Sequence, residues 1–390
     1  MSITLPGPTL GVVGGGQLGR MLAEAASPLG VDVVVLDPTP ACPASGVARD
    51  QIVAGFDDPD GIHALAERVD ALTFEIELAD PEVLAAASEE HDVPVHPDPG
   101  TLETIQDKLV QTEALSDAGI PVPEFAAVAT AEGLERVVEE FDGVMLKARR
   151  GGYDGRGNVP VHEPSEAADA LAAVGGDAMA ERFVDFEREI AVMGLKGADG
   201  ATRTYPVTET IHREEILRES VAPARASDEA IARAEAVAED VLEFLDGRGV
   251  YGIELFETHE GDVLVNEIAP RPHNSGHWTI EGTRTSQFEN HVRAVLGWPL
   301  GPTDLVAPAV TANVLGDTEE TRPATLRGVE AVLDAPEADL HWYGKEDARP
   351  LRKMGHLTLT DETVDAEATA RAALLSRARE LRDGLTFRET

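Results

Sequence analysis

The N-terminal part of the chain alternates apolar runs with glycine-rich turns and amphipathic segments. Thr9–Val13 and Val31–Asp37 are mostly apolar, and such runs are typical of parallel strands buried on both faces. Residues 17–27 carry apolar side chains at helical spacing and predict a connecting helix. The same α/β pattern continues through a predicted strand at 71–77, a helix near 81–90 and a turn-rich stretch at 94–100.

The central part of the chain mixes helical and strand periodicities. One helix is predicted over Leu102–Ala118, because Gly119 and Pro121 end the apolar repeat. A long amphipathic helix is predicted over Asp228–Leu245, with Ser227 as its N-cap. Short strands are predicted at 144–147, 178–184 and 188–194.

Two strands in the C-terminal half, Tyr251–Phe256 and Val263–Glu267, predict a β-hairpin with a tight turn between them. If the turn centres just after Glu260, Glu254 lies directly opposite Glu267. Facing carboxylates repel each other, but a cation between them would stabilise the pair, and oxygen ligands favour Mg²⁺. Alternatively, one glutamate points to solvent or the register slips by one residue.

These segments predict three domains. Residues 1–100 form a Rossmann-like domain, and residues 101–300 form a central domain with a lid subdomain at about 121–185. Residues 301–390 carry shorter strands, turns and a final helix at 365–382, which predict a small C-terminal domain.

Two glycine-rich loops are candidate phosphate-binding elements. Gly14–Gly19 matches the Gly-x-Gly-x-x-Gly dinucleotide pattern, with Asp37 at the end of the next strand. The alternative is a tight turn that lets a helix approach a strand. Arg149–Asn158 is basic and glycine-rich and follows a strand that ends in Lys147, so it can fold over phosphates. It lacks the Gly-Lys-Ser/Thr ending of a P-loop.

Charge and composition restrict the partners. The formal net charge is −40, which argues against nucleic acid and fits a surface adapted to high salt. The single cysteine, Cys42, suits a reducing cytoplasm, and no apolar run predicts a membrane span. An anionic substrate would need a local cluster of the basic residues Lys108, Lys147, Arg156, Arg271, Lys345, Arg352 and Lys353.

The run Val265–Thr279 is the most informative segment for function. It holds a carboxylate, an arginine, two histidines and an asparagine close together. Pro270 and Pro272 restrict its backbone, which is what a site needs to fix reactive groups in place. His273 and His277 are four residues apart, but Pro272 argues against a helix that would aim both at zinc.

These motifs together resemble the ATP-grasp family and, within it, the 5-(carboxyamino)imidazole ribonucleotide synthases. The resemblance implies an α/β fold, α+β in its central part, with a Rossmann-like pre-ATP-grasp domain and a small C-terminal β-rich domain. The segments that carry it are 14–21, 74–77, 149–157, 266–279, 341–345 and 352–356.

The resemblance also implies a nucleotide site and a metal site. Lys108 and Lys147 would approach the phosphates of ATP, and Glu189 would hold the ribose hydroxyls. Glu254 and Glu267 would bind Mg²⁺, in agreement with the hairpin. The implied cofactor-binding set is Lys108, Lys147, Gly152, Tyr153, Asp154, Gly155, Arg156, Gly157, Asn158, Glu181, Arg182, Phe183, Val184, Glu189, His212, Asn266 and Glu267.

A second implied set binds substrate and carries the chemistry. Arg271, His273, Asp154 and Arg156 are the implied catalytic residues, with His273 or Asp154 as a possible general base. The ribonucleotide-binding set is Gly16, Gln17, Leu18, Glu75, Tyr153, Arg156, His273, Asn274, Lys345, Arg352 and Lys353.

The implied reaction is ATP-dependent carboxylation of 5-aminoimidazole ribonucleotide by bicarbonate through carboxyphosphate, in purine (IMP) biosynthesis. The products are N5-carboxyaminoimidazole ribonucleotide, ADP and phosphate. The resemblance further implies a homodimer whose product passes to a separate mutase. Composition and charge predict a cytoplasmic protein that binds neither nucleic acid nor membrane.

Three alternatives remain open at this stage. Another ATP-grasp ligase, such as a formate-using glycinamide ribonucleotide transformylase or a biotin carboxylase, would share the glycine loops but not His273–Thr279. A dinucleotide-binding oxidoreductase rests on Gly14–Gly19 alone. A non-catalytic nucleotide-binding subunit is disfavoured, because every expected ligand position is filled.

Overall fold

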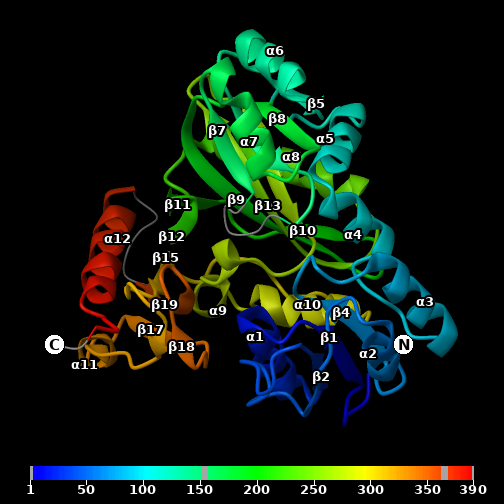
Figure 1. Cartoon of the computed structure of the whole chain (residues 1–390). Helices are drawn as coiled ribbons and strands as arrows, with labels where there is room; N and C mark the ends of the chain where they lie inside the picture. Colours follow the sequence, from blue (N-terminus) through cyan, green and yellow to red (C-terminus); the bar gives the residue numbers. More distant parts are fainter. Residues whose placement is uncertain (1–2, 152–156, 362–367, 389–390) are drawn as a thin grey trace.

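The N-terminal apolar runs form a parallel four-stranded sheet in the order β3-β2-β1-β4. The computed structural model describes residues 3–151, 157–361 and 368–388. The predicted first two strands are confirmed, and the carboxyl ends of β1 and β4 lead into loops that reach the centre of the molecule (Figure 1). The elements of this lobe are β1 (Thr9–Val13), α1 (Gln17–Ala26), β2 (Asp32–Leu36), β3 (Asp50–Ile52), α2 (Pro59–Ala66), β4 (Ala71–Phe74) and α3 (Pro81–His91).

The single helix predicted over Leu102–Ala118 is wrong, because two helices occupy this stretch. α4 (Pro99–Gln106) ends before Asp107, and α5 (Lys108–Asp117) begins after it. The Asp107 carboxylate accepts hydrogen bonds from the backbone N–H groups of Leu109 and Val110, which caps the second helix. Arg149 holds the same carboxylate at 2.6 Å, so the break also anchors the basic loop.

The lid is a four-stranded antiparallel sheet in the order β5-β8-β6-β7. Its apolar side chains pack against α6 and α7 in a small core of their own, and the lid stands above the rest of the chain in Figure 1. Its elements are β5 (Phe125–Val128), α6 (Ala131–Phe141), β6 (Val144–Ala148), β7 (Asn158–Val161), α7 (Ala167–Ala173) and β8 (Ala178–Arg182).

A nine-stranded antiparallel sheet joins the central and C-terminal parts. Its order is β14-β13-β9-β11-β12-β15-β19-β17, with β10 paired to β9, so the C-terminal strands extend the central sheet. The strands are β9 (Phe186–Lys196), β10 (Thr202–Thr204), β11 (Thr208–Arg213), β12 (Ile216–Ala222), β13 (Gly249–Thr258), β14 (Val263–Ala269), β15 (Ala309–Leu315), β17 (Ala338–Trp342) and β19 (Lys353–Thr360).

Helices from the central and C-terminal parts of the chain pack on this sheet. α8 is capped by Ser227, as predicted, and packs on β9, β13 and β14. No helix within the described ranges is long and apolar enough to cross a membrane. The helices are α8 (Asp228–Phe244), α9 (Thr279–Gly282), α10 (Gln287–Val295), α11 (Val329–Leu333) and α12 (Ala368–Asp383), and the short strands β16 (Arg322–Pro323) and β18 (Asp347–Ala348) pair beside them.

α12 is tied to the sheet by a buried carboxylate. Glu219 on β12 is fully buried and lies 3.0 Å from Arg379 and 2.7 Å from Arg382. Burial opposes ionisation, but the two arginines leave the pKa of Glu219 below its usual value.

Glu219→Gln should lower the free energy of unfolding by about 3 kcal/mol, because both guanidinium groups lose their counter-charge. Urea denaturation at fixed salt measures this loss; a change under about 1 kcal/mol would contradict it.

Candidate active site

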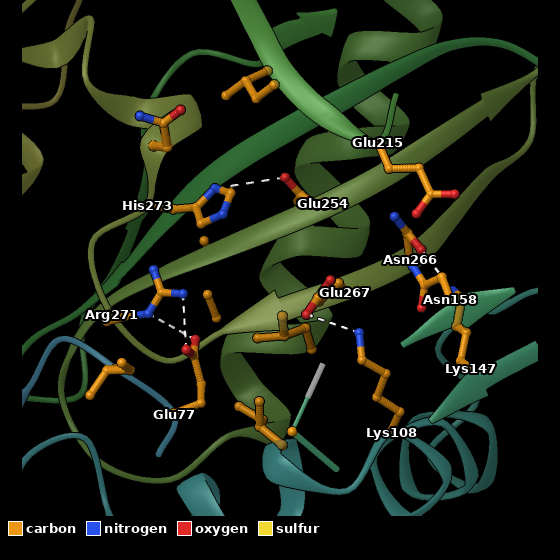
Figure 2. Close-up of a pocket in the computed structure, with 18 of the residues that line it drawn as sticks. Glu77, Lys108, Lys147, Asn158, Glu215, Glu254, Asn266, Glu267, Arg271 and His273 are labelled. Carbon is orange, nitrogen blue, oxygen red and sulfur yellow. Dashed lines mark hydrogen bonds and ion pairs between the residues drawn. The ribbon is translucent and has the colours of Figure 1, made fainter. Parts of the chain in front are cut away.

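One cavity lies where the lid, the nine-stranded sheet and the N-terminal lobe meet. Its volume is about 1120 Å³, which is large enough for more than one small ligand. Its wall combines side chains from β13 and β14, the lid strands β6 and β8, and the loops after β1 and β4. Figure 2 shows the polar side chains that converge there.

The β13–β14 hairpin places two carboxylates opposite each other. Glu254 pairs with Glu267 in the register, which confirms the prediction. Between this pair and the turn, the pairing is shifted by one residue from the prediction, because Leu255 lies opposite Val265. Asn266 has no partner of its own and is the extra residue of a β-bulge. Beyond the bulge, the pairing follows the predicted register. The predicted pair and the register slip therefore both occur.

The two glutamates have different electrostatic surroundings. Burial raises the pKa of Glu254, and the charge of Glu267 raises it further, although His212 acts in the opposite direction. Burial also opposes ionisation of Glu267, but Lys108, whose Nζ lies 3.1 Å from Glu267 Oε1, leaves that pKa below its usual value. The side chain of Glu267 is 46% exposed, so a ligand in the cavity can reach it.

A second cation lies on the lid side of the cavity. The Lys147 Nζ is 2.7 Å from a Glu181 carboxylate oxygen and 3.1 Å from the Asn266 side-chain oxygen. Lys147 comes from β6 and Glu181 from β8, which are neighbouring lid strands. The bulge residue Asn266 therefore links strand β14 to the lid.

Glu189 and His212 form an ion pair on neighbouring strands of the large sheet. Glu189 Oε2 lies 2.9 Å from His212 Nδ1. Burial lowers the pKa of His212, but the hydrogen bond to Glu189 and the charge of Glu254 leave it above its ordinary value. Both residues line the cavity and belong to the set predicted to bind nucleotide.

The proline-bordered loop after β14 carries Arg271 and His273 into the cavity. Arg271 forms two contacts to Glu77, at 2.8 and 3.0 Å, and Figure 2 shows this pair beside the hairpin carboxylates. His273 Nδ1 lies 2.9 Å from Ser275 Oγ and 3.7 Å from a Glu254 oxygen. A side chain at Gly252 would meet the His273 Cβ atom at 2.5 Å, so a glycine is needed where the loop crosses β13.

The glycine loop after β1 is held by carboxylates of its own chain. Gly15 N–H donates to Asp37 at 2.9 Å, and Gly16 N–H donates to Glu75 at 2.5 Å. A dinucleotide pyrophosphate would need these donors. Their occupation weighs against the dinucleotide-binding alternative.

Titration of Glu75 makes the stability of the folded protein depend on pH. Burial, with a smaller contribution from Asp37, raises the pKa of Glu75 from 4.5 to about 7, although the Gly16 N–H opposes the shift. The folded protein thus binds this proton more tightly than the unfolded chain. The resulting stabilisation is complete below pH 4.5 and is lost as pH rises through about 7.

Glu75→Gln should therefore remove about 3 kcal/mol of pH dependence from the free energy of unfolding between pH 4.5 and pH 7. The amide keeps an acceptor for Gly16 but cannot titrate. Denaturant titrations of the wild type and the variant across this range measure the difference. Parallel pH curves for the two proteins would contradict the assignment.

Asn274 connects the cavity to a buried network in the C-terminal part. Its amide exchanges hydrogen bonds with Asn313 at 2.6 and 3.2 Å and contacts His277 Nδ1 at 2.8 Å. Tyr343 Oη lies 2.8 Å from His356 Nδ1 and 3.3 Å from the same His277 nitrogen. His277 is fully buried in this network, and its Nδ1 contacts Asn274, which lines the cavity.

The chain matches three family models in sequence order. They are a ribonucleotide synthetase preATP-grasp domain over residues 8–106, an ATP-grasp domain over 113–288 and a phosphoribosylaminoimidazole carboxylase C-terminal domain over 309–371. The N5-carboxyaminoimidazole ribonucleotide synthase of Brucella melitensis is 41% identical, over 90% of this chain and 96% of that protein. The chain belongs to the N5-carboxyaminoimidazole ribonucleotide synthase family of ATP-grasp proteins.

Two further relatives extend the comparison. Phosphoribosylaminoimidazole carboxylase of Schizosaccharomyces pombe is 41% identical over 91% of this chain, but the match spans only 65% of that longer protein. A crystal structure of an Aspergillus clavatus N5-carboxyaminoimidazole synthase, in complex with ADP and 5-aminoimidazole ribonucleotide, has a TM-score of 0.87 and 34% identity. The structural alignment covers 96% of this chain and 98% of the Aspergillus clavatus chain. The predicted ATP-grasp fold is confirmed.

Most of the predicted site residues lie on the cavity wall. The set is Gly16, Gln17, Leu18, Glu75, Lys108, Lys147, Asn158, Glu181, Arg182, Phe183, Val184, Glu189, His212, Glu254, Asn266, Glu267, Arg271, His273, Asn274 and Lys353. Gly152, Tyr153, Asp154, Gly155 and Arg156 lie outside the described residues.

Three predicted residues are not on the wall as the described part of the chain forms it. Gly157 closes the base of the basic loop, where its carbonyl accepts from the Ala148 N–H at 2.7 Å. Lys345 Nζ donates to the Lys353 carbonyl at 2.6 Å, and Arg352 donates to the Asp347 carbonyl at 2.7 Å. These two side chains are held by backbone oxygens of their own segment.

The sequence prediction missed several residues that do line the cavity. Glu77 is the partner of Arg271, and Arg349 enters from the segment in which Arg352 was predicted. Glu215 lies at the β11–β12 turn, where it and Glu214 both have positive φ angles. A signal existed for Glu77, which ends the Phe74–Glu77 motif, whereas nothing in the sequence singled out Glu215.

Proposed function

We propose that this protein carboxylates 5-aminoimidazole ribonucleotide with bicarbonate at the expense of ATP, in purine biosynthesis. The observation that carries the proposal is the facing pair Glu254 and Glu267 beside Lys108, in a cavity that also contains Arg271. Anionic reactants need such cations within a chain of net charge −40. Membership of the family supports the same reaction.

ATP fits between the lid and the large sheet. Lys108 and Lys147 are positioned for its phosphates, and Glu189 with His212 for its sugar. The facing carboxylates suit a hard cation, because the two charges share one cavity and burial disfavours ionisation of Glu254. Glu254 and Glu267 would hold Mg²⁺, which neutralises charge on phosphate oxygens during phosphoryl transfer.

The chemistry proceeds in two displacements. A bicarbonate oxygen attacks the γ-phosphorus, the bond to ADP breaks, and carboxyphosphate forms. The exocyclic amine of the ribonucleotide then attacks the carbonyl carbon, and the carbon–oxygen bond to phosphate breaks. Arg271, fixed by Glu77, stabilises the anionic oxygens in both steps.

The ribonucleotide binds at the end of the cavity away from the lid. Gly16, Gln17 and Leu18 of the N-terminal lobe line the cavity, as do Asn274 and Lys353 from the C-terminal half, and we assign these residues to the ribonucleotide. The glycine loop therefore faces the ribonucleotide. Lys345, Arg352 and the loop residues 152–156 remain predictions for this site.

His273 is proposed as the group that accepts the amine proton. It lines the cavity, and its Nδ1 lies 2.9 Å from Ser275 Oγ, which orients the ring.

His273→Asn should lower kcat about 100-fold if the proton transfer is catalysed. Steady-state rates measure this effect, and Ser275→Ala serves as the control for ring orientation. An unchanged rate in His273→Asn would remove His273 from the role; Asp154 is the other candidate.

The test of the function is ADP release in high KCl with Mg-ATP and bicarbonate, with and without 5-aminoimidazole ribonucleotide. Strong stimulation by this ribonucleotide is expected. Stimulation instead by glycinamide ribonucleotide with formate would move the function to a transformylase. Folded protein that shows no turnover with either substrate would leave a nucleotide-binding role only.

Further features of this function are part of the proposal. The high acidic charge favours activity in concentrated salt, and the single cysteine, Cys42, suits a cytoplasmic setting. A homodimer and transfer of the product to a separate mutase are proposed from the family resemblance. The domain limits 1–100, 101–300 and 301–390, with a lid at about 121–185, remain proposals.

A further inference from the structure

A cluster of metal-binding side chains lies on the N-terminal lobe, outside the cavity wall. Among the residues that the structure describes, His63, Glu90 and His91 form one group whose ligand atoms all lie within 4.8 Å of one another. His63 comes from the last turn of α2, and the other two residues end α3. None of the three lines the cavity.

We propose that this cluster binds a zinc-class divalent transition metal ion that joins α2 to α3. His63 Nδ1 lies 3.2 Å from His91 Nε2 and 3.4 Å from Glu90 Oε2. In tetrahedral coordination with bonds of ~2.0 Å, neighbouring ligand atoms lie ~3.3 Å apart. Both separations match a shared tetrahedral ion with little rearrangement.

The donor types and their surroundings select the class of ion. Two imidazoles and a carboxylate are a common zinc set, whereas Mg²⁺ prefers oxygen ligands alone. Both helices end near the cluster, and the negative end of a helix dipole favours a cation. Glu90 is 68% exposed and His63 29% exposed, so an ion could enter from solvent and keep a water ligand.

The proposed ion stabilises the N-terminal lobe and takes no part in catalysis. α2 and α3 pack against each other, and three protein ligands shared between them would restrain that packing. The competing explanation is a hydrogen bond between two neutral histidines, which needs no metal. The two explanations differ in whether stability depends on Zn²⁺.

The test is thermal unfolding of the full chain after chelator treatment and dialysis, in high KCl with excess Mg²⁺. Saturating ZnCl₂ should raise the midpoint by about 3 °C. The shift should disappear in His63→Ala and His91→Ala, be reduced in Glu90→Gln, and persist in His259→Ala, which removes an exposed histidine elsewhere.

Absence of a Zn²⁺ shift in the wild type, or a full shift in both histidine variants, would overturn the proposal. If those variants fail to fold, Co²⁺ binding to the wild type distinguishes the metal site from a hydrogen bond between two histidines. A strong visible absorption, typical of tetrahedral cobalt with nitrogen ligands, supports the site. A spectrum no stronger than that of aqueous Co²⁺ overturns it.

Discussion

Replacing Glu267 with glutamine should lower kcat about 1000-fold. The amide keeps the size of the side chain but loses the charge that faces Glu254 across the hairpin and lies 3.1 Å from Lys108. Cation binding weakens, and Lys108 is left without its carboxylate partner in that position. Ribonucleotide-dependent ADP release measures the loss.

The control for this variant lies on the same hairpin. Glu260→Gln changes an exposed carboxylate at the turn and should leave the rate unchanged. Because Glu267 is 46% exposed in the cavity, its replacement should leave the unfolding midpoint close to that of the wild type. A rate within tenfold of the wild type would exclude Glu267 as an essential metal ligand.

Replacing Arg271 with lysine should lower kcat/KM by about 100- to 1000-fold. The guanidinium contacts both oxygens of Glu77, at 2.8 and 3.0 Å, and this paired contact fixes its direction. An ammonium group cannot reproduce that geometry, although it preserves the charge. Steady-state kinetics with varied ribonucleotide and ATP measure the effect.

Two further variants separate orientation from charge. Arg293→Lys alters an arginine that pairs with Glu289 on α10 and should leave kinetics unchanged. Glu77→Gln should reduce kcat/KM in the wild type but add little in the Arg271→Lys background, because Glu77 acts through Arg271. Wild-type activity in Arg271→Lys would contradict the role of the oriented guanidinium.

The facing pair of glutamates could be predicted from local sequence, but the detailed geometry of the hairpin could not. Alternating apolar residues and a glycine turn were sufficient to place Glu254 opposite Glu267. The bulge residue Asn266 contacts the lid, where its side chain accepts a hydrogen bond from Lys147. Hydrophobic periodicity does not report a contact between residues 119 positions apart.

The break between α4 and α5 illustrates a competing local signal. Apolar spacing runs through residues 102–118 and predicts one helix, but Asp107 satisfies free N–H groups better as an N-cap than within a helix. The partner of that carboxylate, Arg149, is distant in sequence. Recognition of Asp107 as a cap would have predicted the two helices.

Side-chain partnerships across the chain were the least predictable part of the site. Arg271 was selected from its own motif, but its partner Glu77 lies 194 positions away. The family resemblance assigns Lys345 and Arg352 to the ribonucleotide, whereas in the structure both side chains donate to nearby carbonyl oxygens. Sequence motifs select residue types, but they do not report the direction of a side chain or its partner.

The most direct measurement is a single-turnover reaction with bicarbonate labelled with both ¹³C and ¹⁸O, together with Mg-ATP and 5-aminoimidazole ribonucleotide. We predict ¹³C in the carboxyl group attached to the ribonucleotide amine and one ¹⁸O atom in the phosphate released. In Glu267→Gln both labels should appear about 1000-fold more slowly. Phosphate without ¹⁸O, or a ribonucleotide without ¹³C, would contradict carboxylation through carboxyphosphate.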